Sequence, residues 1–270
     1  MIAEDIINRL AVVEIEKLKI HEEVVEPNLT NLKETMLNTG KLVDPIIIDD
    51  KYNIVLDGNH RRMILEELKA NYVICQPVDY SDPRIKIGGW YIATKDIEFD
   101  QIDAPKIDFE QGLQELNEYK AYMLVAKKNA SKIEYKILES SYKNFDGVIK
   151  EQKEFFKQRI GEDISTKNGN GNTLFIEDIR KDLFLEKGYT VFLRKIYTKE
   201  EVVKTILAGK IFPPKSTRHQ IPERVLRINF RLGYLNESKE SIQMHLDEMI
   251  KKRVKYGSAR YYTEPVIVLY

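Results

Sequence analysis

The sequence predicts an α/β (α+β) fold in which helices pack on a mixed sheet. In the first hundred residues, short β-rich runs alternate with segments whose apolar residues follow the helical period. A composition with 43% hydrophobic residues, 13 Gly and 9 Pro is typical of a globular protein. At 270 residues, the chain is long enough for one large domain or two.

Residues 1–95 are expected to form a compact first unit. Two short apolar runs flank the polar turn at residues 49–52, which indicates a β-hairpin, and a helical pattern follows directly. We expect strands at residues 11–15, 45–48, 53–56 and 72–78, and helices at residues 30–37 and 59–68.

Residues 96–270 are expected to form a second part of the fold. The acidic stretch 96–111 is expected to cross the surface between the two parts, and the Gly/Asn-rich residues 167–172 predict a flexible loop. Thr198 and Glu201 have the spacing of a capping box, which begins a helix. We expect strands at 121–126, 133–138, 189–193, 225–230 and 264–270, helices at 145–160, 198–208 and 238–254, and a loop at 213–219.

Charge and composition exclude several classes of protein. The 43 basic and 43 acidic residues give a net charge of +0, which argues against binding nucleic acid mainly by neutralising phosphates. The acidic N-terminus and the lack of an apolar run of roughly 20 residues argue against a signal peptide and a membrane span. The single cysteine, Cys75, lies in an apolar run, so no intrachain disulfide forms. We expect a cytoplasmic protein with a buried thiol.

The most informative segment is a short turn between a predicted strand and a predicted helix, Asp57-Gly58-Asn59-His60-Arg61. Glycine permits a tight turn, and the first backbone amides of a helix carry a partial positive charge. With a histidine and an arginine on the first helical turn, the segment suits a phosphate group. The alternative is a helix start with solvated basic residues.

This turn after a hairpin resembles the nucleotide-binding motif of the ParB/sulfiredoxin-like superfamily. Further segments are similar to those of the free serine kinases in that superfamily: His21-Glu22, Gly89-Trp90-Tyr91, residues 198–202 and residues 214–219. The resemblance implies a ParB/sulfiredoxin-like nucleotide-binding domain at residues 1–95. It also implies a C-terminal α/β domain at residues 96–270, with the active site in the cleft between them.

The resemblance implies an enzyme that transfers a phosphoryl group from ATP or ADP to the hydroxyl of free L-serine. The product, O-phospho-L-serine, would serve a biosynthetic step towards cysteine or towards a siderophore by way of diaminopropionate. Mg²⁺ with ATP or ADP is the implied cofactor, and L-serine and an adenine nucleotide are the implied partners, without nucleic acid. The donor nucleotide, the acceptor amino acid, the pathway and the oligomeric state stay open.

Two carboxylates are the implied catalytic residues. Glu22 is expected to take the proton of the serine hydroxyl, and burial or the neighbouring Glu23 would have to raise its pKa to make it an effective base. Asp57 is expected to hold Mg²⁺ or to orient a phosphate-binding group. Without the resemblance, Glu22 reads as an ordinary surface acid and Asp57 as a helix N-cap.

The other implied site residues bind phosphate or substrate. Gly58, Asn59, His60 and Arg61 would bind phosphate oxygens, and Thr217, Arg218 and His219 would close over the nucleotide or the amino acid, since arginine pairs well with phosphate and carboxylate. His21 and Trp90 are the expected substrate contacts, although a sole tryptophan in a strand also suits the core, and His245 is expected to be structural. At Asn59 some free serine kinases carry a second histidine, and at Asp44 relatives carry a basic residue.

Two other functions remain as alternatives. One is a ParB-like regulator that binds DNA in a nucleotide-dependent manner, against which stand the neutral charge and the lack of a convincing helix-turn-helix. The other is sulfiredoxin-type reduction, which needs a nucleophilic cysteine beside the phosphate motif. Cys75, in an apolar strand, is poorly placed for it.

Overall fold

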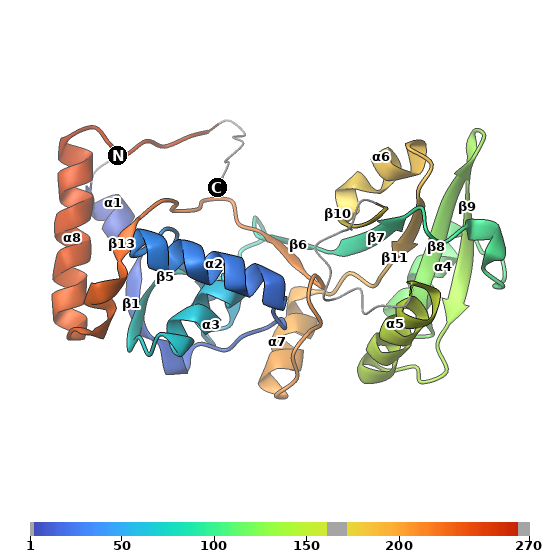
Figure 1. The fold of residues 1–270 in the computed structure, drawn as a ribbon, viewed down its shortest axis with the longest axis horizontal. Helices are drawn as coiled ribbons and strands as arrows, with labels where there is room; N and C mark the ends of the chain where they lie inside the picture. The colour runs from blue at the N-terminus through green and yellow to red at the C-terminus, as the bar shows by residue number, and fades with distance from the viewer. Residues whose placement is uncertain (1–2, 161–171, 264–270) are drawn as a thin grey trace. The chain divides into compact units, whose positions relative to one another are not determined.

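The computed structural model describes residues 3–160 and 172–263, which pack into two compact units. We call them the terminal unit, within residues 1–20, 31–80 and 223–270, and the central unit, residues 21–30 and 81–222. Figure 1 shows the elements of both units. These units differ from the predicted domains 1–95 and 96–270, because residues 81–95 pack with the central unit and the segment from Glu223 packs with the terminal unit.

The terminal unit contains a four-stranded mixed sheet in the order β1-β5-β3-β4. β1 and β4 run antiparallel to their neighbours, whereas β3 and β5 are parallel. All four residues of β3 are buried, as in a strand covered on both faces. The strands match four predicted runs: β1 (Ala11–Glu14), β3 (Ile46–Asp49), β4 (Val55–Asp57) and β5 (Tyr72–Val78).

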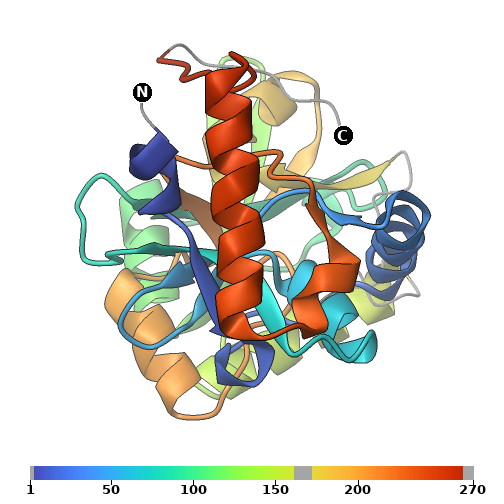
Figure 2. The same cartoon turned by 90° about the vertical axis from the view of Figure 1, so that its left-hand side faces the viewer.

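Helices cover this sheet and its edges. The last one, α8 (Lys239–Lys255), begins at the N-cap Ser238, buries Ile242, Leu246 and Ile250, and packs against α1 and β1. Figure 2 shows α8 along this side of the unit. The other elements are α1 (Ala3–Ile7), η1 (Ile15–Lys17), α2 (Glu26–Thr39), which enters the unit at Asn31, β2 (Lys41–Leu42), α3 (Asn59–Glu67), β13 (Phe230–Arg231) and η5 (Leu232–Asn236).

The predicted strand at residues 225–230 is wrong for most of its length. Only Phe230 and Arg231 pair, with β2, because Arg227 and Asn229 have positive φ angles of 55° and 49° that break an extended ladder. The predicted strand at 264–270 and the loop at 167–171 lie outside the described residues.

The central unit contains a five-stranded antiparallel sheet in the order β10-β7-β11-β8-β9. Alternate residues of β8 enter two different hydrophobic clusters: Met123 and Val125 pack with Phe156 of α5, and Leu124 and Ala126 pack with residues of α4 and α6. The sheet therefore has helices on both faces. The bounds are β7 (Trp90–Thr94), α4 (Phe109–Asn117), β8 (Ala121–Asn129), β9 (Lys132–Glu139), α5 (Phe145–Ile160), β10 (Thr173–Glu177), α6 (Lys181–Glu186) and β11 (Thr190–Leu193).

The remaining elements of the central unit include the short strands and the helix next to the candidate site. The capping box predicted at Thr198 and Glu201 is confirmed and begins α7 (Lys199–Leu207). β12 (Arg218–Gln220) pairs with β6 (Lys86–Gly88). One residue, Gly89, separates β6 from Trp90, the first residue of β7. A short 3₁₀ helix, η2 (Phe99–Gln101), precedes α4, and η4 (Asp178–Arg180) precedes α6. Among the described residues, none of the helices is both long and apolar enough to span a bilayer.

Gly147 tests the packing of α5. A Cβ at this position would lie 2.0 Å from Cβ of Tyr142, so a side chain requires the backbone to move. In an exposed helix interior, Gly→Ala stabilises by about 1 kcal/mol. We instead expect Gly147→Ala to lower the free energy of unfolding by about 1–3 kcal/mol, measured by denaturant titration. Gly233→Ala is the control, because no atom lies within 4 Å of its added Cβ. Equal stability of the two variants would contradict this packing.

Candidate functional site

The central unit holds the carboxylate of Glu22 in a set of hydrogen bonds from one loop. The backbone N–H and hydroxyl of Thr217 both donate to Oε1 of Glu22 at 2.6 Å, and the N–H of Lys215 donates to Oε2 at 3.1 Å. Backbone hydrogen bonds between Phe212 and both His21 and Glu23 align the two segments. The predicted residues 21–22 and 217 are thus brought together, although 195 residues separate Glu22 from Thr217.

The proton arrangement follows from this geometry. The Thr217 hydroxyl has one proton, which it donates to the acceptor-only carboxylate of Glu22. Oγ1 of Thr217 therefore accepts from Nε2 of His21, 2.8 Å away. The same nitrogen lies 3.6 Å from Oε1 of Glu22, and the His21 ring meets the edge of the His219 ring at 5.2 Å between centroids. His21 thus orients the hydroxyl that fixes Glu22.

Burial opposes ionisation of Glu22, but the hydrogen bonds and charge contributed by His21, with those of Thr217, outweigh it and hold the pKa below its ordinary value. The raised pKa that would make Glu22 a strong base is therefore not present. Glu23 does not contribute either, since its side chain is exposed and lies 3.6 Å from the ammonium of Lys153. Glu22 is a fixed carboxylate that is ionised at neutral pH.

A half-buried arginine that the sequence analysis missed, Arg194, donates hydrogen bonds to the backbone of this loop. Arg194 donates to the carbonyl of Trp90 through Nε at 3.0 Å and Nη2 at 2.8 Å, and Nη2 also donates to the carbonyl of Lys215. Burial lowers its pKa, while the nearby Tyr197 and Glu22 oppose that shift. Its position directly after the apolar strand β11 was the available signal. Arg194 fixes the backbone at both Trp90 and Lys215.

Trp90 lies against the same loop. Its indole N–H donates to the carbonyl of Thr217 at 3.1 Å, and the Lys215 ammonium lies 4.5 Å from the centroid of its ring. Lys215 has a φ of 59°, a left-handed conformation that is uncommon for residues other than glycine. The indole therefore helps to shape the loop, and its contact with substrate stays a prediction.

Arg218 and His219 follow on β12, beside Gly88 and Ile87 of β6. Nε of Arg218 lies 3.2 Å from the carboxylate of Glu177, whereas its buried Nη1 has no hydrogen-bond partner within residues 3–160 and 172–263. Part of the guanidinium is thus paired within the protein. The phosphate or substrate contact predicted for Arg218 stays a prediction.

The terminal unit holds the other predicted group, at the turn between β4 and α3. Gly58 has a φ of 105°, and a Cβ there would lie 3.0 Å from Nη2 of Arg61, so the position requires glycine. Nη1 of Arg61 donates to the carbonyls of Asp44 at 2.9 Å and Pro45 at 2.7 Å. Arg61 therefore ties the turn to the residues before β3, a structural task that the sequence did not indicate.

One carboxylate oxygen of Asp57 accepts hydrogen bonds from two arginines. Oδ2 is bonded by Nη2 of Arg61 at 3.1 Å and by Arg224, which the sequence reasoning missed. Burial disfavours the ionised form, but the charges of the two guanidinium groups outweigh it and lower the pKa of Asp57. The N-cap of α3 is Gly58, so Asp57 does not cap the helix. Asn59 is buried in the first turn and His60 is half-buried beside it.

The donor set at Asp57 fits a magnesium ion only in part. Among the described residues, no three His, Cys, Asp or Glu side chains are grouped to hold a metal ion. Mg²⁺ usually binds through one or two carboxylates together with nucleotide phosphates and water. Asp57 fits that use as a single protein ligand through its second oxygen, since Oδ2 already serves two guanidinium groups.

Cys75 is fully buried in β5, as expected. Burial raises the pKa of its thiol far above the ordinary value, and the charge of Arg61 only partly offsets this. A thiol that stays protonated is a poor nucleophile. The sulfiredoxin-type alternative has no support from this environment.

The fold defined by these two units is that of the free serine kinases. A solved free serine kinase in complex with AMP superimposes with a TM-score of 0.65 at 21% identity, covering 84% of this chain and 93% of that chain. SbnI with a C-terminal truncation, from Staphylococcus aureus, has a TM-score of 0.61 at 16% identity and covers 95% and 100%. Both likenesses concern the fold.

Sequence comparison identifies the family. No family model matches the chain. The ATP-dependent L-serine kinase of Staphylothermus marinus is 30% identical over 231 residues, 78% of this chain and 84% of the relative. The ADP-dependent L-serine kinase SerK of Thermococcus kodakarensis is 27% identical over 231 residues, 83% and 91% of the two chains. The chain belongs to the free serine kinase family.

The lowered pKa of Glu22 predicts a dependence of stability on pH. A carboxyl group with a depressed pKa in the folded state stabilises that state above its unfolded pKa of about 4.3, and this contribution is lost as pH falls through the folded pKa. Glu22→Gln should therefore lower the free energy of unfolding at neutral pH, and its difference from the wild type should shrink below about pH 4. Urea titrations across this range measure it. The exposed Glu23→Gln is the control, and a difference that is independent of pH would contradict the assignment.

Proposed function

We propose that this protein transfers a phosphoryl group from ATP or ADP to the hydroxyl of free L-serine, giving O-phospho-L-serine. The similarity to ATP- and ADP-dependent L-serine kinases over about four fifths of the chain supports this activity. The single structural observation that carries it is the fixed carboxylate of Glu22, held by the backbone amides of residues 215 and 217. Phosphoryl transfer needs alignment and charge more than covalent chemistry from the protein.

Glu22 is the proposed acceptor of the serine hydroxyl proton. Its lowered pKa keeps it ionised at neutral pH but makes it a modest base. A modest base is sufficient where the transition state is loose and the proton leaves late, as with the catalytic aspartate of protein kinases. The donors from Thr217 and Lys215 fix the carboxylate in one orientation, so little reorganisation is needed when the proton arrives.

The turn from Asp57 to Arg61 is the proposed phosphate site. The N-terminus of α3 supplies a partial positive charge there, next to His60. Arg61 acts mainly by holding the turn in shape, because its guanidinium already donates to two carbonyls and to Asp57. Thr217, Arg218 and His219 are proposed to contact the nucleotide or serine from the central unit.

Mg²⁺ bound with the nucleotide would neutralise charge on the phosphate oxygens, with Asp57 as its one protein ligand. His21 and Trp90 are proposed to contact the serine, beside the carboxylate that receives its proton. The protein is proposed to act in the cytoplasm. Its product would enter the biosynthesis of cysteine or of a siderophore.

The activity is tested by incubating the protein with ATP or ADP, Mg²⁺ and a panel of hydroxy amino acids, followed by ³¹P NMR. We expect a new phosphomonoester signal with L-serine, and the comparison of the two nucleotides identifies the donor. Omitting Mg²⁺ tests the metal requirement. Absence of this signal with both nucleotides, in a folded preparation that binds nucleotide, would overturn the proposed function.

Glu22→Gln keeps the size of the side chain and removes its charge. General-base catalysis typically contributes about 10²–10⁴-fold, so kcat should fall at least about a hundredfold. Nucleotide affinity should stay near that of the wild type, because the loss is confined to the transition state. Single-turnover rates and calorimetry separate the two effects, with Glu23→Gln as the matched control. A rate within a few-fold of the wild type would remove Glu22 as the base and make Asp57 the next carboxylate to test.

Arg61→Ala should weaken nucleotide binding by roughly tenfold or more, as expected for the loss of a charge-assisted contact and of the turn that it supports. It should also destabilise the fold, since buried acceptors lose their donor. Calorimetry and denaturant titration measure the two effects. Arg84→Ala removes the same charge from an exposed position and is the control. Unchanged affinity in folded Arg61→Ala would exclude both the direct and the supporting role.

A further inference from the structure

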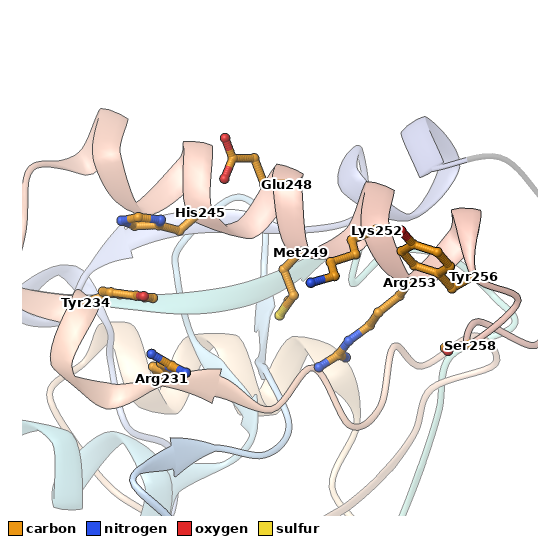
Figure 3. A pocket seen from close by; sticks show the side chains of 9 residues that line it. All are labelled: Arg231, Tyr234, His245, Glu248, Met249, Lys252, Arg253, Tyr256 and Ser258. Atoms are coloured by element: carbon orange, nitrogen blue, oxygen red, sulfur yellow. The ribbon is translucent and has the colours of Figure 1, made fainter.

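The terminal unit contains a cavity of about 530 Å³ that is open to solvent, with Arg231, Lys252 and Tyr256 exposed in its lining, and that shares no residue with the proposed active site. It lies between α8 and the segment of β13 and η5, as Figure 3 shows. Its volume falls within the range of small-molecule sites, about 300–1,000 Å³. This cavity is large enough for a small organic ligand.

Three basic side chains line the cavity: Arg231, Lys252 and Arg253. Within residues 3–160 and 172–263, Arg231 and Lys252 have no acidic partner, and Arg253 donates only from Nη1, to the carbonyl of Arg227 at 2.8 Å. Glu248 is the one carboxylate in the lining. The lining therefore has a net charge of +2. It also has N–H groups without a hydrogen-bond partner among the described residues.

One end of the cavity holds an aromatic pair, with Arg231 beside it. The rings of Tyr234 and His245 stack with their centroids 4.1 Å apart and their planes 13° from parallel. Nε2 of His245 also lies 3.1 Å from the carboxylate of Glu237, which fixes the imidazole. Figure 3 shows Lys252 and Arg253 further along α8 from His245, whereas Arg231, on β13, lies beside Tyr234. A ligand with one anionic group and a small organic part could contact both the basic side chains and the aromatic pair.

We propose that this cavity binds a phosphate-bearing small molecule, at a site separate from the one that performs phosphoryl transfer. A phosphate monoester carries a charge of about −1.5 to −2 at neutral pH, which matches the excess of two positive charges. The planar forks of Arg231 and Arg253 suit phosphate oxygens, and Lys252 adds a point charge. Tyr234 and His245 form the wall for the organic part of the ligand.

The four histidines of the chain provide a test that separates the two sites. Only His245 lies in this cavity, whereas His21, His60 and His219 belong to the proposed active site. Each imidazole gives its own signal in a ¹H–¹³C NMR spectrum, and single His→Gln variants assign the signals. Titrating the full-length protein with pyrophosphate should shift the His245 signal in a saturable manner.

The double variant Arg231→Gln, Lys252→Gln tests the basic residues. It should raise the midpoint of the His245 shift at least about tenfold, as expected for the loss of charge-assisted contacts, and leave the other three histidine signals responsive to nucleotide. Lys239→Gln, Lys251→Gln is the control, because it removes the same charge from exposed positions of α8 outside the cavity. Thermal unfolding of both double variants verifies that they fold.

Three further probes identify the ligand class. Inorganic phosphate, O-phospho-L-serine and ADP separate the contribution of the phosphate from that of the organic part, and citrate tests whether a carboxylate suffices. Tighter binding of a phosphate ester than of citrate supports the proposal. A His245 signal that does not move, moves only without saturation, prefers citrate, or responds equally in the two double variants overturns it.

Discussion

The hydrogen bonds between Glu22 and the loop at residues 215–217 are the constraint on which the candidate site depends. A mostly buried carboxylate is stable only when its oxygens accept good hydrogen bonds, and here two backbone amides and one hydroxyl supply them. Lys215, whose N–H donates one of these hydrogen bonds, has a left-handed backbone conformation. That backbone also accepts a hydrogen bond from Arg194, so a half-buried cation and a mostly buried anion both bind the loop at residue 215.

Features with a local cause were predictable from the sequence. The hairpin of β3 and β4, the start of α7 and the turn at Gly58 depend on residues close together in the chain, and each is found where expected. Features set by distant partners were not. The segment at residues 225–230 has the composition of a strand, yet side chains of Gln76 and Asp44 bind its backbone in place of a neighbouring strand.

The same distinction applies to the candidate site. His21, Glu22, Thr217 and His219 were predicted from a family resemblance and lie together. The direction of the pKa of Glu22 was not predictable, because it depends on the balance between burial and hydrogen bonds from residues far away in the sequence. Arg194 and Arg224 were missed because the sequence around an isolated arginine does not show which carbonyl or carboxylate it binds, and for Arg194 the only signal was its position after an apolar strand.

The chain order of the terminal unit has a consequence for biosynthesis. Its sheet begins with β1, but α8, which packs on β1, is translated only after the entire central unit. On the ribosome the central unit is therefore complete while the apolar surface that Ile242 and Leu246 later cover is still exposed. Nascent chains expose such surfaces to aggregation and to chaperones. The terminal unit thus completes its core only at the end of synthesis, and a message truncated before α8 encodes all four strands of its sheet without the helix that covers β1.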